Sequence, residues 1–185
     1  IFEERLKIND YLPLELYFHN DEPDRGTMNT RTKKTYKEAY VSYFMMKEEY
    51  EKQAPETNKF FEEFLQKNFN TLNLVLEMLL EDLLNNNIME LQIKGYASPL
   101  HISGYNKNLS KRRISSVINY IKEFKRGALN EYIDKNKLII TELSFGESKS
   151  SEEVSDDYKN KKESIYSVGA MRERKIEIVD VILKK

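Results

Sequence analysis

The chain has 185 residues, of which 39% are hydrophobic and 33% charged, so it is long enough for one domain with a real core and a highly charged surface. Its 30 basic and 31 acidic residues give a net charge of -1. That balance argues against a general nucleic-acid or membrane-surface binder, because such proteins normally carry a basic excess. The absence of cysteine excludes disulfides, thiolate catalysis and cysteine metal ligands.

The N-terminal residues 1–11 are mixed and charged, and we interpret them as a linker or the tail of an upstream region. Because the chain begins with Ile1 rather than Met, we expect a fragment or a mature product, with any targeting segment upstream. Residues 12–18 alternate between apolar and polar side chains, which predicts a strand, and Pro13 places it at a strand start or a sheet edge. Residues 20–31 are rich in turn formers and predict a loop.

Two helices are expected next. Residues 35–53 predict a helix with an aromatic and Met side, and Pro55 ends it. Residues 56–84 predict a long helix whose aromatic and aliphatic stripe we interpret as core rather than as a cofactor site. The stripe contains Phe60, Phe61, Phe64, Leu65, Phe69, Leu72, Val75, Leu76, Leu79, Leu80, Leu83 and Leu84.

The stretch from residue 89 to residue 124 organises the rest of the chain. Met89, Leu91 and Ile93 alternate with polar residues, which predicts a half-buried strand that ends at Gly95. A polar loop is expected over residues 96–108. Apolar residues then recur at three- and four-residue spacing, which predicts a helix over residues 109–124. A strand that leads through a loop into a helix is a common place for a small-ligand site.

The C-terminal part is predicted to complete the sheet. Gly127 and the two basic residues before it predict a helix end, and residues 128–133 a short helix. Residues 137–143 predict a strand, 145–162 a polar loop and 164–170 a turn with one helical coil. Residues 174–182 predict the last strand, with Ile176, Ile178 and Val181 facing inward. The order of elements predicts an α/β (α+β) two-layer sandwich with helices on one face of a small mixed sheet.

The sequence gives catalysis no positive support. Its two histidines, His19 and His101, are far apart in the chain but both are expected near strand ends. A metal or acid–base pair is one interpretation, and two ordinary loop histidines are the other. A glycine-rich phosphate loop and a nucleophile elbow are both absent from the sequence. We therefore expect no enzyme activity, no catalytic residue, no metal and no cofactor.

Several short segments carry a family resemblance. Residues 95–98 read Gly-Tyr-Ala-Ser, and residues 105–117 read Tyr-Asn-Lys-Asn-Leu-Ser-Lys-Arg-Arg-Ile-Ser-Ser-Val. They resemble the Gly-His-Thr-Asp strand end and the Tyr-Asn-x-x-Leu-Ser-x-x-Arg-Ala-x-x-Val segment of OmpA-like (OmpA/MotB-type) peptidoglycan-binding domains, with matching spacing. Residues 146–148 and 174–178 resemble that family's later turn and closing strand. The Gly-Tyr-Ala-Ser-Pro variant, with a long helical insert before it, is most similar to OmpA-family proteins of Bacteroidota.

The resemblance implies a fold and a role. The fold would be a βαβαββ OmpA-like fold over residues 12–185, with a helical insertion after the first strand at about residues 20–58. The role would be non-covalent binding of the diaminopimelate-type stem peptide of peptidoglycan. Such binding anchors an outer-membrane protein or lipoprotein to the cell wall from the periplasm. A membrane would be reached only through upstream regions, and no nucleic acid is expected as a partner.

The resemblance also implies site residues. In the family a strand-end carboxylate holds the ammonium of diaminopimelate and an early helical Arg holds its carboxylate, for which Arg offers two parallel donors. Arg113 matches that Arg, the alternative being a surface Arg paired with a nearby acid; Lys111 and Arg112 are expected to be solvated. Ser98 replaces the family's Asp and brings no charge. Asn106 matches the family's Asn and is equally consistent with an ordinary turn residue.

The missing anion has candidate replacements. Asn20, Asp21 and Glu22 follow the first strand, whose end lies at the same edge in the family, so they are expected to line the pocket. Arg174 matches a pair of basic family residues, some of which hold ligand or a loop. The alternative function is a protein-interaction module that has lost wall binding because of Ser98. It would dock an envelope protein through the insertion, on Tyr36, Tyr40, Tyr43, Phe44, Met45 and Met46.

Overall fold

The four strands of the described residues form one mixed sheet. The computed structural model describes residues 7–97, 104–147 and 164–185. The strands are β1 (Leu14–Tyr17), β2 (Ile88–Ala97), β3 (Leu138–Glu147) and β4 (Lys175–Lys184). They lie in the order β1-β4-β2-β3. Strand β4 runs antiparallel to β1 and β2, and β2 runs parallel to β3.

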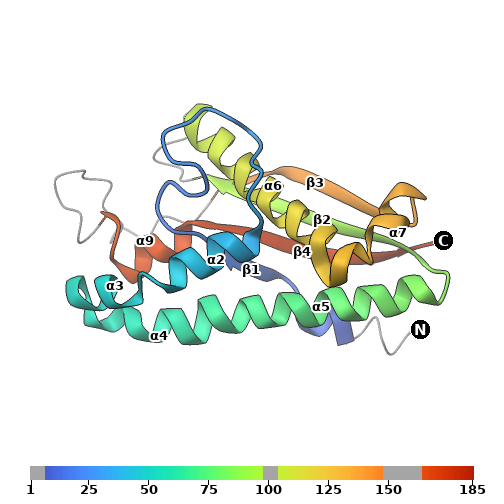
Figure 1. Cartoon of the computed structure of the whole chain (residues 1–185), viewed down its shortest axis with the longest axis horizontal. Helices are drawn as coiled ribbons and strands as arrows, with labels where there is room; N and C mark the ends of the chain where they lie inside the picture. Colours follow the sequence, from blue (N-terminus) through green and yellow to red (C-terminus); the bar gives the residue numbers. More distant parts are fainter. Residues whose placement is uncertain (1–6, 98–103, 148–163) are drawn as a thin grey trace.

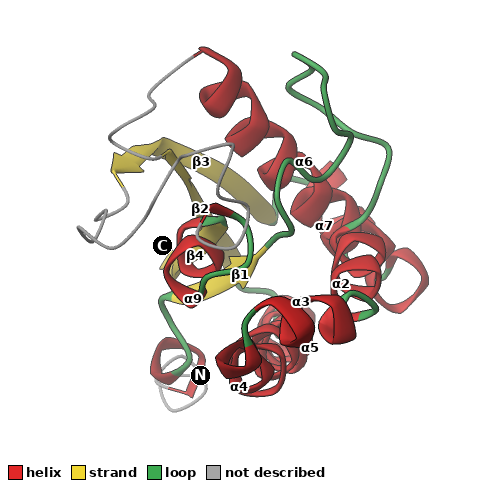
Figure 2. Cartoon of the chain, turned by 90° about the vertical axis from the view of Figure 1, so that its left-hand side faces the viewer, coloured by secondary structure: helices red, strands yellow, loops and turns green. Residues whose placement is uncertain are grey.

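The larger helices cover one side of this sheet. Between β1 and β2 the chain forms α2 (Tyr36–Phe44), α3 (Lys47–Gln53), a 3-10 turn (Pro55–Thr57), α4 (Asn58–Phe60), a π-helical segment (Phe61–Gln66) and α5 (Lys67–Leu84). Helices α6 (Gly104–Gly127) and α7 (Asn130–Asp134) follow β2, and α9 (Val168–Glu173) precedes β4. Figure 2 shows α2, α5, α6 and α7 on the same side of the strands, which confirms the predicted α+β class.

Strand β2 lies inside the sheet and is longer than expected. Met89, Leu91 and Ile93 face the core, as the alternation predicted. The expected end at Gly95 is wrong, because β3 continues to pair with β2 up to Ala97 after a register shift. The same pairing carries β3 to Glu147, beyond the predicted end of that strand. Helix α6 begins at Gly104, five residues before the first residue of the predicted helix, Leu109.

Strand β4 faces the core with Ile176, Ile178 and Val181, as predicted. The spacing changes from two to three because the register with β2 shifts between Gln92 and Ile93, which pair with Asp180 and Ile178. Val179 is the extra residue of this bulge.

The helix predicted over residues 35–53 is two helices. Thr35 caps α2 through a capping box with Glu38, so the predicted start is confirmed. The helix breaks after Phe44 and resumes at Lys47. The long helix of residues 56–84 is confirmed as one nearly continuous helical run, and its apolar stripe supplies much of the core.

The apolar side chains that the structure describes form two clusters. The main core lies between the sheet and helices α5 and α6, and it includes Ile8, so the described end of the expected linker packs onto the domain. A second group, which we call the aromatic cluster, lies at the end of β1. It consists of Tyr17, Tyr43, Tyr50, Phe60, Phe61, Leu65 and Met171. Its tyrosine and phenylalanine rings meet edge to face, as between Tyr50 and Phe61 at 5.3 Å.

The arrangement is seen best along the length of the molecule. Figure 1 shows α5 spanning the lower edge and α6 crossing above it, with the chain after β1 looping up beside the start of α6. Within residues 7–97, 104–147 and 164–185, none of the helices has the length and apolarity needed to cross a membrane.

The core prediction is testable on α5. Replacing Leu76, which is fully buried, with Ala should lower the free energy of unfolding by about 2–5 kcal/mol, because the change leaves a cavity among packed side chains. Leu84→Ala, on the same helix but 64% exposed, is the matched control and should change it by less than about 0.5 kcal/mol. Urea unfolding measures both. Equal losses would show that this face of α5 is not the core.

Candidate functional site

Three buried arginines surround the chain segment that follows β1. Arg112 and Arg113 come from the third turn of α6, and Arg174 is the residue before β4. They are 0%, 4% and 8% exposed. We call residues 19–34 the strap, because they run from β1 to α2 across the side of α6.

Arg112 holds the middle of the strap. Its Nε donates to the carbonyl of Pro23 at 2.6 Å, and its Nη1 donates to the carbonyls of Thr27 at 3.0 Å and Asn29 at 2.7 Å. The expectation that Arg112 is solvated is therefore wrong, whereas Lys111 is exposed as predicted. The reason is the helical period, because Arg112 lies on the face of α6 that the strap covers.

Other side chains on that face repeat the pattern. Asn108 Nδ2 donates to the carbonyl of Met28 at 3.0 Å, and Ser115 Oγ accepts from the amide of Thr32 at 3.3 Å. Asn119 Nδ2 donates to the carbonyls of Thr32 at 2.8 Å and Lys34 at 2.9 Å. Residues 108, 112, 115 and 119 form one stripe at helical spacing, so a single face of α6 fixes the path of the strap.

Arg113 follows Arg112 on the helix and contacts the beginning of the strap, next to β1. Its Nε donates to the carbonyl of Glu22 at 3.0 Å, and its Nη2 approaches the carbonyl of His19 at 3.5 Å. The guanidinium also lies 5.3 Å from the centre of the Phe18 ring. Burial, with the nearby charges of Arg174 and Arg112, lowers the pKa of Arg113 to about 9, so it remains charged at neutral pH.

Arg174 connects this region to the aromatic cluster. It donates to the carbonyls of Phe18 at 3.3 Å and Ile165 at 2.9 Å, and to the hydroxyl of Tyr50 at 3.1 Å. The Tyr50 hydroxyl lies 2.6 Å from His19 Nδ1. Because that hydroxyl accepts from Arg174, its proton is available to His19. Arg174 thus links the end of β1, the segment before α9 and Tyr50 of α3.

Asp21 brings a carboxylate to the start of α6. Its Oδ2 accepts from the amide of Gly26 at 3.1 Å, and its Oδ1 accepts from the hydroxyl of Tyr105. Burial and the Asp21 carboxylate raise the pKa of Tyr105, so the phenol stays protonated. Asp21 also acts on Arg113, because its negative charge favours the charged guanidinium.

The remaining predicted site residues have different surroundings. Glu22 is ion-paired with Arg25 at 2.9 Å. Asn20 is half-buried in the turn after β1, and Asn106 is half-buried in the first turn of α6. Ser98, like His101, lies outside the described residues. The structure therefore gathers Asn20, Asp21, Arg113 and Arg174 around the end of β1 and the beginning of α6.

The docking patch predicted on the insertion exposes less apolar surface than expected. Tyr36 and Tyr43 are buried in the two clusters, so they are not part of an exposed patch. Met45 at 80% and Val41 at 44% are the largest apolar exposures on α2 and the residue after it. Tyr40, Phe44 and Met46 are half-buried against the aromatic cluster.

Sequence reasoning missed Arg112, Tyr50 and Tyr105 as parts of this region. The signal for Arg112 was its four-residue spacing from Asn108 on a polar stripe. Tyr105 lies in the quoted motif, but nothing in the sequence pairs it with Asp21. In the described part of the chain, no group of three or more His, Asp or Glu side chains could hold a metal ion.

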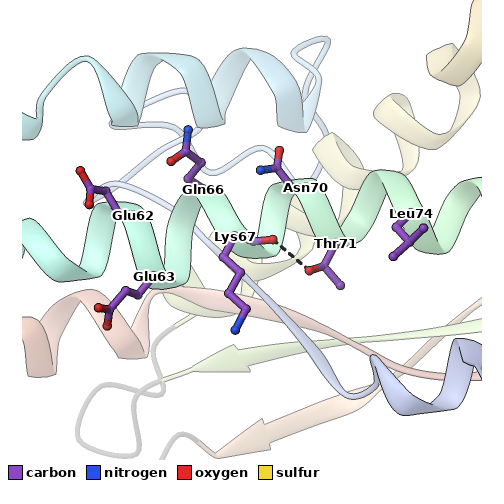
Figure 3. Close-up of a pocket in the computed structure, with 7 residues that line it drawn as sticks. All are labelled: Glu62, Glu63, Gln66, Lys67, Asn70, Thr71 and Leu74. Atoms are coloured by element: carbon purple, nitrogen blue, oxygen red, sulfur yellow. Dashed lines mark hydrogen bonds between the residues drawn. The ribbon is translucent and has the colours of Figure 1, made fainter.

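A groove along the outer side of α5 has a different character. It is lined by seven residues of the π-helical segment and α5, and Figure 3 shows their side chains spread along one helix rather than converging on a point. Glu62 is paired with Lys47 at 2.9 Å, and Thr71 donates to the Lys67 carbonyl at 2.9 Å. This surface offers no concentrated charge, so we do not take it as the site.

Comparison of this chain with family models, curated proteins and solved structures found no match in any of the three.

The role of Arg112 predicts a local loss of order. Arg112→Met should leave three strap carbonyls without their donor, speed amide hydrogen exchange over residues 23–32, and lower the free energy of unfolding by at least about 3 kcal/mol. Lys107→Met, at an exposed position on the first turn of the same helix, is the control and should change neither quantity. Unaltered exchange in the strap would contradict this role for Arg112.

His19 predicts a pH dependence. Burial, then the charge of Arg174, lowers its pKa from 6.5 to about 3, so the folded protein keeps it neutral while the unfolded chain takes up a proton below 6.5. Its contribution is present above pH 6.5 and is lost as the pH falls towards 3. When the pH is lowered from about 7.5 to about 5, the free energy of unfolding of the parent, measured in urea, should fall by about 2 kcal/mol more than that of His19→Gln. Parallel curves for the two proteins would refute a buried neutral His19.

Proposed function

We propose that this chain is an OmpA-like domain that binds the diaminopimelate-type stem peptide of peptidoglycan without covalent bonds. In this proposal it has the βαβαββ OmpA-like topology, with α2, α3 and the strap as the insertion and α9 as a short helix before the last strand. It works in the periplasm and anchors an outer-membrane protein or lipoprotein to the wall. It is a binding protein and not an enzyme.

The observation that carries the proposal is the position of Asp21. The free end of diaminopimelate has an ammonium and a carboxylate on one carbon, so its recognition needs an anion and a cation close together. Asp21 is held by Tyr105 at the start of α6, and the carbonyl of its neighbour Glu22 contacts Arg113. Asp21 thus supplies the charge that Ser98 lacks, from the loop after β1.

Each site residue has a role in this proposal. Asp21 accepts from the ligand ammonium, and Arg113 attracts the ligand carboxylate while it also supports the strap. The beginning of α6 adds backbone N–H groups and the positive end of the helix dipole. Asn20 and Asn106 supply polar groups at the rim, and Ser98 a hydroxyl. Arg174 acts indirectly, because it supports Phe18, whose ring contacts Arg113.

The buried charge in this region also favours an anionic ligand group. The oxygens that accept from Arg112, Arg113 and Arg174 are backbone carbonyls and the Tyr50 hydroxyl, which carry no full negative charge. Burial and then repulsion from Arg174 and Arg112 lower the pKa of Arg113, and a carboxylate brought beside it would offset that repulsion.

The test is co-sedimentation with purified sacculi. The parent should sediment with diaminopimelate-type sacculi, and Asp21→Asn should bind about ten- to a hundredfold more weakly, because the amide keeps the shape of the side chain but loses its charge. Asp10→Asn removes the same charge at an exposed position before β1 and should bind like the parent. Arg113→Lys, checked first by thermal unfolding, tests the cation.

Two outcomes would overturn the proposal. One is a parent that does not sediment with any sacculi. The other is an Asp21→Asn variant that binds as tightly as Asp10→Asn. Sacculi with lysine in place of diaminopimelate lack the second carboxylate, so they separate recognition of the zwitterionic end from general adhesion to the wall.

A further inference from the structure

The outer face of α6 carries a second concave surface, distinct from the site at the end of β1. A groove of about 460 Å³ runs along it between the strap and β3. Lys111 and Lys122 lie at its two ends on α6, and Arg31 reaches it from the strap. Because Lys122 lies eleven positions after Lys111 on the helix, the groove is about 16 Å long. We call it the basic groove.

The cations of the basic groove have not been neutralised by the protein. In the described ranges, the side chains of Arg31, Lys111 and Lys122 make no ion pair within 4.0 Å, although Lys34 nearby is paired with Asp24 at 3.4 Å. Glu142 of β3 is the acid that lines the groove. Three cations against one carboxylate make this a positive patch on a chain whose net charge is -1.

The walls of the basic groove are fixed in place. The strap side is pinned to α6 by the amide of Thr32 on Ser115 and by Asn119 on two strap carbonyls. Ser115 Oγ accepts in this contact, so its proton remains available to a ligand. Ile118 provides an apolar patch between the two lysines. A ligand would meet a prearranged set of donors around a small apolar surface.

We propose that the basic groove binds a small phosphate-bearing molecule. Arg31 offers a planar pair of donors to phosphate oxygens, and the two lysines act as point charges on either side. The volume fits one sugar phosphate, with the ring over Ile118 and the phosphate among the cations. A nucleic acid is disfavoured, because its phosphates would extend past the groove onto a surface with no basic excess. The inference does not depend on the proposed wall binding.

The experiment is isothermal titration of the parent, in low-salt buffer, with glucose 6-phosphate, inorganic phosphate and glucose. We expect glucose 6-phosphate to bind and glucose not to bind. The double variant Lys111→Gln with Lys122→Gln should weaken binding by at least about tenfold, the effect of losing one good charged contact. Glu142→Gln should tighten it, because a repelling carboxylate is removed.

A matched control separates a site from general charge attraction. Lys52→Gln with Lys59→Gln removes the same two charges from exposed positions on α3 and α4 and should bind glucose 6-phosphate like the parent. Equal binding of inorganic phosphate would support the groove with free phosphate as its ligand. No binding by the parent, or equal losses in the two double variants, would overturn the proposal. Sacculus binding of the Lys111 and Lys122 variant should be unchanged, so failures of the two proposals are distinguishable.

Discussion

The rest of this structure depends on hydrogen bonds from buried arginines to the carbonyls of the strap. A guanidinium removed from water is unfavourable unless its donors are satisfied, and a buried carbonyl is unfavourable without a donor. Arg112 and Arg113 supply donors to these carbonyls, because Nε and Nη1 of Arg112 contact Pro23 and Asn29 and Nε of Arg113 contacts Glu22. A loop without regular structure thereby has one defined path, and Asp21 has one defined position beside Tyr105. Nη2 of Arg112 is buried without such a partner among the described residues.

These hydrogen bonds leave positive charge inside the protein. Carbonyl dipoles stabilise a guanidinium but do not neutralise it. Burial, together with the charges of neighbouring arginines, therefore lowers the pKa of Arg113 and keeps His19 neutral. The aromatic cluster helps to hold His19 and Arg174 in place, since Tyr50 contacts both of them. Charge that the fold does not neutralise is available for a ligand, and that availability underlies the proposed recognition of a stem-peptide carboxylate.

Helix α6 serves three purposes on three faces. Ile114, Val117 and Ile121 pack into the main core. The face with Arg112 and Asn119 holds the strap, and the face with Lys111 and Lys122 borders the basic groove. A helix can do this because 3.6 residues per turn separate neighbours in sequence by about 100° in space. Neighbouring Lys111 and Arg112 are consequently exposed and buried, respectively.

By itself, the sequence determined the α+β class, the inward faces of β2 and β4, the long apolar stripe of α5 and the position at which α2 begins. These features follow from local periodicity, which a chain shows before it folds. Tertiary structure alone decided the burial of Arg112, the pairing of Asp21 with Tyr105 and the extension of β2 past Gly95. In each case the deciding partner lies many tens of residues away or on another strand, and periodicity carries no information about such a partner. The sequence marked Asp21 and Arg113 as candidates, and the folded strap brought them to the same end of α6.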